Sequence, residues 1–382
     1  MNVPFPRLKK ILILSNGYGE DQIACHLIRA LWEHDPSIEV VVMPLVGEGK
    51  EYRSLSLLPV CKNKQMPSGG FIRNPLHFFR DLGAGVLGNH LSQMRQMRSV
   101  TEDVDFTIAV GDVFCCVMAS RHNAGPVFFL PTAKSDFFMP HTRLEKKLIK
   151  RIATQVYPRD QLTSDSLKAS GINSIYLGNP MMDHLQFSDE MFGVKEGAFV
   201  VGLLPGSRKE GYSNLVLLLN LIDKMALLGG DYEYILAKAK TLDLSVLRKQ
   251  LKSTSWKLVY KDPYLRLLNT RTGKTVILTG QFPDVLKVSQ VVIGLAGTAN
   301  EQAVYMGKTV LCFKGSGPQS SRKRFKEQEK LLGDALRFVD EQDTSRLAKR
   351  LYEMIQGVSY QSPMTPQLPN ASEAIIASIV GL

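Results

Sequence analysis

Short β-rich runs alternate with helical patterns along most of the chain, and this alternation constrains the fold more than any other feature. It is typical of an α/β protein with mainly parallel sheets. A Gly-Asn-Pro turn within Tyr176–His184 and the polar stretch Phe187–Gly197 separate two series of runs. We therefore predict two Rossmann-like domains, with strands at Ile11–Leu14, Val40–Met43, Phe106–Val110, Val127–Leu130 and Thr154–Tyr157, then at Phe199–Leu204, Tyr234–Ala237, Val276–Thr279, Val291–Gly294 and Val310–Phe313.

The length of the chain supports the same division. A chain of 382 residues, 44% of them hydrophobic, is too long for one core. We expect one domain over residues 1–184 and a second over 198–362. Residues 363–382 form a predicted crossing segment with three prolines, followed by an apolar helix that returns to the first domain. Asn370 is its expected N-cap, with Glu373 completing a capping box.

The amino-acid composition indicates the cellular compartment of the protein more clearly than its function. No apolar run approaches the roughly 20 residues that span a bilayer, and the first ten residues lack the apolar stretch of a secretory signal. The five cysteines form no Cys-x-x-Cys pair, so we expect reduced core residues in a cytoplasmic protein. Lys and Arg outnumber Asp and Glu by 47 to 36, a net charge of +11. Such an excess attracts polyanions without choosing among nucleic acid, anionic lipid and phosphorylated substrates.

Two glycines and two acids mark the first strand-to-helix turn, in Ser15–Ile28. Gly17 and Gly19 permit a close backbone approach, while Glu20 and Asp21 are expected in the first helical turn, where the helix dipole favours negative charge. The turn lacks the third glycine of a dinucleotide fingerprint, and its carboxylates would repel phosphate. It is either a tight turn with well-placed acids or a site for sugar hydroxyls.

Two turns in the second half favour an anion instead. In Val201–Tyr212 a strand ends in Pro205-Gly206-Ser207, whose backbone N–H groups can face a phosphate beside Arg208. In Ser289–Val304, Gly294 and Gly297 precede a helix expected to begin near Ala299, with Thr298 as a cap and Glu301 placed for a ribose diol. The ordinary alternatives are a solvated Arg208 and plain capping by Thr298 and Glu301.

Three segments together carry a resemblance to a known family. "YLGNPMMD", "LLPGSR" and "LAGTANEQAV" occur in this order and at roughly this spacing. The set resembles lipid A disaccharide synthase, an inverting glycosyltransferase of the GT-B fold, over most of the chain, and "LPGSR" is its most specific part. The first loop, "SNGYGED", departs from that enzyme's Gly-Glu-x-Ser-Gly-Asp pattern. The chain is therefore most similar to the lipid-A-disaccharide-synthase-related branch.

The resemblance implies a nucleotide sugar, as a UDP-sugar, bound by the C-terminal domain, and an amphipathic or lipid-linked acceptor bound by the N-terminal one. Asp112, after the strand Phe106–Val110, matches the family's acid and is the expected base that deprotonates the acceptor, with Glu20 as second choice and helix capping as the ordinary alternative. The residues implied to bind the donor are Gly206, Ser207, Arg208, Gly297, Thr298, Ala299, Glu301 and Gln319. Gln319 lies in a loop that either closes on the donor or is an ordinary surface loop. The residues expected to bind the acceptor are Asn16, Gly17, Gly19 and Asp21.

A metal or other cofactor is not expected. The only Asp-x-Asp, at 103–105, precedes a strand, whereas a metal–diphosphate site would need it after one. The seven histidines show no His-x-x-x-His or comparable pairing.

Two basic, apolar segments favour contact with an anionic membrane surface. Residues 69–98 interleave Phe and Leu with Arg, and Arg143–Ile152 places Leu144, Leu148 and Ile152 at helical spacing beside four cations. Packing of each apolar face on a sheet is the ordinary alternative. Nucleic acid is not expected as a partner, because aromatic residues do not alternate with the cations around Arg322. The rival functions are a nucleotide-sugar epimerase and a non-catalytic nucleotide-binding module, and the oligomeric state is not indicated.

Overall fold

The computed structural model describes residues 9–60, 103–120, 125–137, 139–183, 185–360 and 370–381. The chain divides into two compact units, Met1–His184 with Pro369–Leu382, and Leu185–Leu368. Residues 69–98, the three prolines after 362 and His184 lie outside the described residues.

The first unit contains a five-stranded parallel sheet with the order β2-β1-β3-β4-β5. Its strands follow the predicted buried runs closely. The elements are β1 (Lys10–Ser15), α1 (Tyr18–His34), β2 (Glu39–Pro44), the 3-10 turn η1 (Lys50–Leu55), β3 (Phe106–Gly111), α4 (Val113–Ser120), β4 (Val127–Pro131), α5 (Arg143–Ile152), β5 (Gln155–Val156), α6 (Gln161–Ala169), η2 (Pro180–Met182) and α13 (Ala371–Val380).

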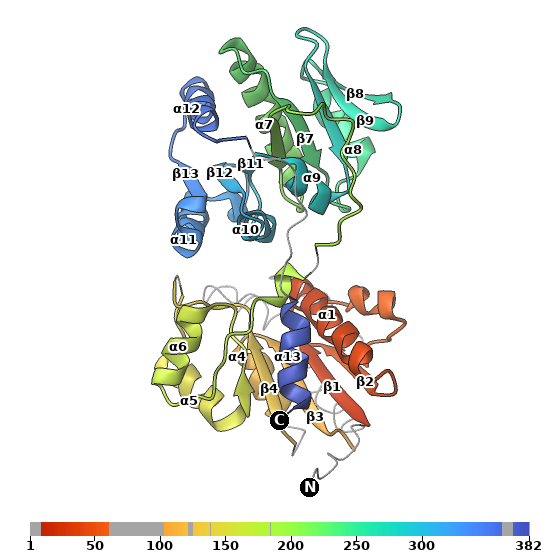
Figure 1. The fold of residues 1–382 in the computed structure, drawn as a ribbon, viewed down its shortest axis with the longest axis vertical. Helices are drawn as coiled ribbons and strands as arrows, with labels where there is room; N and C mark the ends of the chain where they lie inside the picture. The colour runs from red at the N-terminus through yellow and green to blue at the C-terminus, as the bar shows by residue number, and fades with distance from the viewer. Residues whose placement is uncertain are drawn as a thin grey trace, which may run out of the picture. The chain divides into compact units, whose positions relative to one another are not determined.

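Both faces of this sheet are covered, because successive strand side chains point to opposite faces. Ile11 and Ile13 pack in a core with α1 and α13, whereas Leu12 and Leu14 pack in a second core with α4. Figure 1 shows α13, at the C-terminal end of the chain, lying beside α1. The closing helix therefore belongs to the first unit, as the sequence predicts.

The junction motif "LGNPMMD" anchors this closing helix. Both carboxylate oxygens of Asp183 accept N–H groups from the first turn of α13, at 3.0 Å from Ala371 and 2.7 Å from Ser372. Asn370 caps the helix as predicted, by accepting the N–H of Glu373. The capping box is not complete, because the Glu373 carboxylate receives the side-chain amide of Asn370 instead of its backbone N–H.

The second unit contains an eight-stranded sheet with the order β13-β12-β11-β6-β7-β10-β9-β8. Its strand pairs are parallel except for β8–β9 and β9–β10, which place an antiparallel hairpin at one edge. The elements are β6 (Val200–Leu204), α7 (Gly211–Leu227), β7 (Glu233–Ala237), α8 (Leu244–Leu251), β8 (Trp256–Lys261), β9 (Tyr264–Asn269), β10 (Thr275–Thr279), α9 (Phe282–Val288), β11 (Val291–Gly294), α10 (Thr298–Tyr305), β12 (Thr309–Phe313), η3 (Pro318–Ser320), α11 (Arg322–Leu332), η4 (Gly333–Ala335), β13 (Leu336–Val339) and α12 (Thr344–Gln356).

Three of these strands, β8, β9 and β13, are absent from the predicted set. Strands β8 and β9 pair antiparallel at the sheet edge and are half-exposed, so they lack the buried apolar run by which the other strands are recognised. Strand β13 is only four residues long and contains a charged residue, Arg337.

Candidate functional sites at the two sheet edges

Each unit has one point at which the strand order reverses. In the first unit the chain runs from β1 outward to β2 and then returns to place β3 on the other side of β1; in the second, β7 and β11 flank β6 in the same way. Ligands of open parallel sheets bind outside the carboxyl ends of the strands at such a switch point. The predicted turns fall there, after β1 and β3 in one unit and after β6 and β11 in the other.

Glu20 lies at the edge of the first sheet with little exposure to water. Its side chain is 9% exposed, and Oε1 accepts the hydroxyl of Thr132, the residue after β4, at 3.1 Å. Thr132 is itself fixed by its backbone, since its N–H donates to Gly111 and its carbonyl accepts from Arg159. Burial raises the pKa of Glu20, and nearby Asp112 raises it further, while the Thr132 hydroxyl opposes the shift. A carboxyl group of this kind is suited to proton transfer.

Asp112 lies near Glu20 and also caps the N-terminus of α4. Its Oδ1 accepts the N–H of Cys115 at 3.2 Å, in the first turn of α4, and Asn16 hydrogen-bonds the same carboxylate. Desolvation by burial is the main reason why its pKa is raised. A Cβ on Gly111, whose φ is +148°, would lie 1.9 Å from Oδ1 of Asn16, so a glycine is required here. The predicted cap and the predicted base are thus the same carboxylate.

Asp21 points away from the surface. Its side chain is 3% exposed, and Oδ1 accepts the Ser15 hydroxyl at 2.6 Å. The Ser15 oxygen also lies 2.6 Å from the hydroxyl of Tyr52, which is completely buried. Burial raises the pKa of Asp21 from 3.8 to about 7. The expected direct contact of Asp21 with an acceptor does not fit this position, because the carboxylate is enclosed behind the turn.

Of the two glycines in the first turn, only Gly17 is required by the space around it. Glu20 and Asp21 occupy the first turn of α1, as predicted. A Cβ on Gly17 would lie 2.3 Å from Oε2 of Glu20, so this position must be small for the carboxylate to fold back over it. A Cβ on Gly19 would meet nothing within 4 Å, and steric crowding therefore does not explain the second glycine.

The turn after β6 is held from both sides and presents a cation. Gly206 has a φ of +95°, which favours glycine. Asn214 on α7 donates to the carbonyl of Pro205 at 3.0 Å, and the Thr241 hydroxyl donates to the carbonyl of Ser207. Among the described residues, no ion pair holds Arg208, and both Ser207 and Arg208 are exposed. Lys209 and Lys240, on the same and the neighbouring loop, are exposed as well.

The turn after β11 brings a helix N-terminus to the same edge. A Cβ on Gly294 would lie 2.0 Å from Oδ1 of Asn300, so the close approach of α10 requires glycine. Helix α10 begins at Thr298, one residue earlier than predicted, and no side chain caps it, so Thr298 is not the cap. Its uncapped N–H groups can bind an anion. Ala299 packs against the core, and the side chain of Gln319, in η3, is outside the described set.

Glu301 is more enclosed than a surface ligand group. Its side chain is 4% exposed, and Oε1 lies 3.5 Å from both a terminal nitrogen of Arg324 and Nε2 of Gln328, two residues of α11. Sequence reasoning missed Arg324, Gln328, Thr132 and Arg159. Thr132 and Arg159 shortly follow predicted strands, so the rule that identified Asp112 also identifies them; no local signal identifies the pair on α11.

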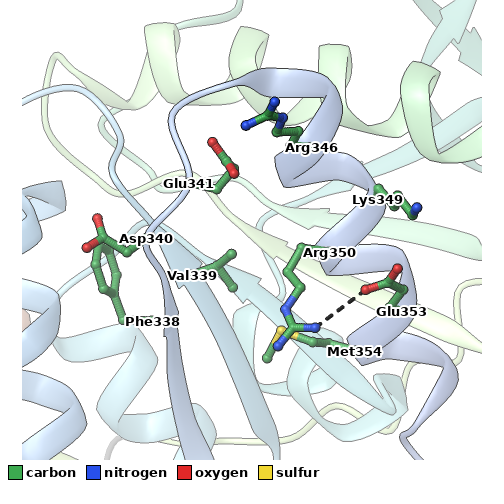
Figure 2. A pocket seen from close by; sticks show the side chains of 9 residues that line it. All are labelled: Phe338, Val339, Asp340, Glu341, Arg346, Lys349, Arg350, Glu353 and Met354. Carbon is green, nitrogen blue, oxygen red and sulfur yellow. Dashed lines mark hydrogen bonds and ion pairs between the residues drawn. The ribbon is translucent and has the colours of Figure 1, made fainter.

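One hollow in the second unit lies away from the predicted residues. Its volume is about 460 Å³, and it lies between the end of β13 and α12. Figure 2 shows the side chains that line it, none of which is a predicted site residue. Three acidic and three basic side chains share it, and Arg350 pairs there with Glu353. Within the described ranges, no three His, Cys, Asp or Glu side chains gather as metal ligands would. No described helix is both long and apolar enough to cross a bilayer.

Basic, apolar helix α5 is only partly exposed. Ile149 is buried in the core, and Leu148 and Ile152 pack against it, which is the ordinary role of such a face. Leu144, in contrast, is 67% exposed. Thr142 and Glu145 form a complete capping box at its start, and Glu145 also pairs with Lys134 at 2.7 Å.

Comparisons with known proteins address the fold. No protein-family model and no curated protein matches the chain. Solved structures do match: UDP-GlcNAc 2-epimerase from Neisseria meningitidis bound to UDP-GlcNAc (13% identity, 98% of this chain and 100% of that one, TM-score 0.57), the Staphylococcus aureus MnaA–UDP complex (16%, 97% and 96%, 0.55) and the glycosyltransferase SnogD from Streptomyces nogalater (12%, 98% and 99%, 0.49). At these identities the first two likenesses show the fold alone. The chain has the GT-B fold, with two Rossmann-like domains.

Proposed function

We propose that this protein is an inverting, metal-independent glycosyltransferase that moves a sugar from a UDP-sugar to a lipid-linked or amphipathic acceptor at an anionic membrane surface. The observation that carries the proposal is the contrast between the two switch points. One presents a buried and a half-buried carboxylate with raised pKa values, and the other presents glycine turns, a helix N-terminus and an exposed arginine. Proton abstraction and diphosphate binding require these two kinds of surface respectively.

The second unit is the proposed donor site. Arg208 is exposed for a charge-assisted hydrogen bond to the diphosphate, beside the N–H groups of the Gly206–Ser207 turn and of Gly297–Ala299. Glu301, at the start of the same helix, is the proposed acceptor for the ribose hydroxyls. The resemblance of "LPGSR" and "LAGTANEQAV" to lipid A disaccharide synthase supports the same assignment, with Gln319 as a further contact.

The first unit is the proposed site of the base and acceptor. The acceptor hydroxyl gives its proton to Asp112, its oxygen attacks the anomeric carbon with inversion, and UDP leaves with the bonding electrons. Glu20 is the second candidate for the base. Asn16, Gly17 and Gly19 line the turn at which the acceptor would bind, while Asp21 supports the turn from behind.

An exposed apolar rim beside these carboxylates supports an amphipathic acceptor. Helices α4, α5 and α6 all begin at this edge of the sheet, and their first turns and the preceding loop carry large exposed apolar side chains. Asp136 in that loop is tied to α6 by a hydrogen bond from its N–H to Thr163. The exposed apolar side chains are Phe114, Phe137, Met139, Leu144 and Leu162, with Arg143 and Lys147 exposed among them. Basic and apolar groups together favour anionic lipid.

The test is sugar transfer. We expect the purified protein with radiolabelled UDP-sugars to label a component of a membrane lipid extract, and Asp112→Asn to abolish this labelling while UDP still binds. Loss of labelling only in Arg248→Ala, an exposed arginine on α8, would contradict the site assignment. UDP binding without turnover of any donor would instead indicate a non-catalytic nucleotide-binding module.

A nucleotide-sugar epimerase is the second candidate. The likeness to UDP-GlcNAc 2-epimerase at a TM-score of 0.57 favours it, whereas the apolar rim has no use in a reaction without an acceptor. Incubation with UDP-GlcNAc alone separates the two. Formation of its C2 epimer without any acceptor would establish the epimerase. If UDP-GlcNAc stays unchanged alone and is consumed only after lipid is added, the transferase would be established.

A further inference from the structure

We propose that Arg324 and Gln328, on α11, are positioning residues that fix the Glu301 carboxylate and the Gly297 turn, and thereby make the nucleotide site selective for a ribose diol. The proposal rests on the proposed function, because it assigns a specificity to the same nucleotide site. It concerns residues outside both predicted glycine turns.

Gln328 joins three parts of the α10 N-terminus. Its side chain is 1% exposed, and Nε2 donates to the carbonyl of Gly297 at 2.9 Å and to Oε1 of Glu301 at 3.5 Å. Its Oε1 accepts from Nδ2 of Asn300 at 3.5 Å. The buried amide of Gln328 therefore holds Gly297, Asn300 and the Glu301 carboxylate together.

Arg324 supplies the charge that this carboxylate needs. Its terminal nitrogen lies 3.5 Å from the same oxygen, Oε1 of Glu301, with both side chains largely buried. Removal from water disfavours an unpaired carboxylate, so the Arg324 guanidinium offsets the cost of burying Glu301 and holds its side chain in one orientation. Both contacts converge on one oxygen from the α11 side. A carboxylate fixed in this way is a preorganised acceptor for hydroxyl groups.

Preorganisation gives the expected specificity. A fixed, desolvated carboxylate loses a hydrogen bond when a ligand lacks the hydroxyl that it should bind, and this loss is how polar sites reject deoxy analogues. A mobile carboxylate turns to water instead and rejects them weakly. We therefore expect the wild-type protein to prefer UDP over 2′,3′-dideoxy-UDP by roughly 10- to 100-fold, the effect of a hydrogen bond to a charged group.

Calorimetric binding of these two nucleotides to the full chain tests the proposal. In Arg324→Met the preference for UDP should fall to near unity through weaker UDP binding alone, with 2′,3′-dideoxy-UDP affinity unchanged. Arg324→Lys should restore part of the preference, and Glu301→Gln should reproduce its loss. Arg322→Met is the matched control, because this exposed neighbour pairs with Asp340 instead. If Arg324→Met does not fold, Gln328→Met is expected to show the same loss of preference.

Two results would overturn the proposal, and they differ from failure of the proposed function. An unchanged preference in a folded Arg324→Met and Gln328→Met would show that α11 does not set it. Equal weakening of both nucleotides would show a merely structural role. Absence of UDP binding to the wild-type protein would overturn the donor site itself, and the inference with it.

Discussion

The two switch points share one architecture and carry opposite electrostatics. At the β1/β3 edge, Glu20 is buried and Asp112 is half-buried, and desolvation raises the pKa values of both acids. At the β6/β11 edge, Arg208 is exposed and the buried acid Glu301 is paired with Arg324. The strand order therefore determines where a site forms, and the residues that follow the strands determine whether it handles protons or anions.

The largest expected effect comes from a substitution at the β1/β3 edge that leaves the β6/β11 edge intact. Replacement of Asp112 by Asn should lower kcat by roughly 100- to 10,000-fold, the usual contribution of a general base, with UDP affinity nearly unchanged. Glu20→Gln should lower kcat less if it only assists. Asp165→Asn, an exposed acid on α6, is the control and should have no effect on kcat. A larger loss in Glu20→Gln than in Asp112→Asn would reverse the assignment of the base.

A second prediction concerns the stability of the acidic edge. The folded-state pKa of Asp21, about 7, lies above its ordinary value of 3.8, so the folded protein binds this proton more tightly than the unfolded chain. This contribution to stability is complete below about pH 3.8 and is lost as pH rises towards 7. At pH 8 the free energy of unfolding of Asp21→Asn, measured by urea denaturation, should therefore exceed that of wild type by up to about 4 kcal/mol. This difference should shrink towards pH 4. An equal difference at both pH values would contradict it.

The smallest expected effect identifies which carboxylate titrates. Asn16 hydrogen-bonds Asp112, and Thr132 hydrogen-bonds Glu20, and both bonds favour the charged form. With Asp112 as the base, kcat falls as pH drops through its raised pKa, and Asn16→Ala should move this acid limb upward by roughly 0.4 to 1 pH unit. Thr132→Val should leave the limb in place. The opposite pattern would make Glu20 the base.

Much of this organisation is predictable from the sequence, because it depends on local patterns. The buried parallel strands appear as continuous apolar runs, and the turns that follow them name Glu20, Asp112 and Arg208. The half-exposed hairpin β8–β9 lacks such a run and was missed.

The remaining details depend on tertiary packing. Whether Asp21 faces the surface or Ser15 depends on how α1 rotates over β1, and both orientations fit the same first helical turn. The contact of Arg324 with Glu301 joins residues 23 positions apart through the packing of α11 on α10, which no spacing rule encodes. The sequence thus indicates which residues reach each edge, whereas packing decides what they contact.

The most direct test of the contrast between the two edges is calorimetric binding of UDP to the wild-type protein, Arg208→Ala and Asp112→Asn, with Arg248→Ala as the charge-matched control. We expect wild type, Asp112→Asn and Arg248→Ala to bind UDP alike, and Arg208→Ala to bind it roughly 10- to 100-fold more weakly through loss of a charge-assisted hydrogen bond. Equal UDP affinity in Arg208→Ala, or a loss of affinity in Asp112→Asn instead, would contradict the assignment of the nucleotide to the second unit.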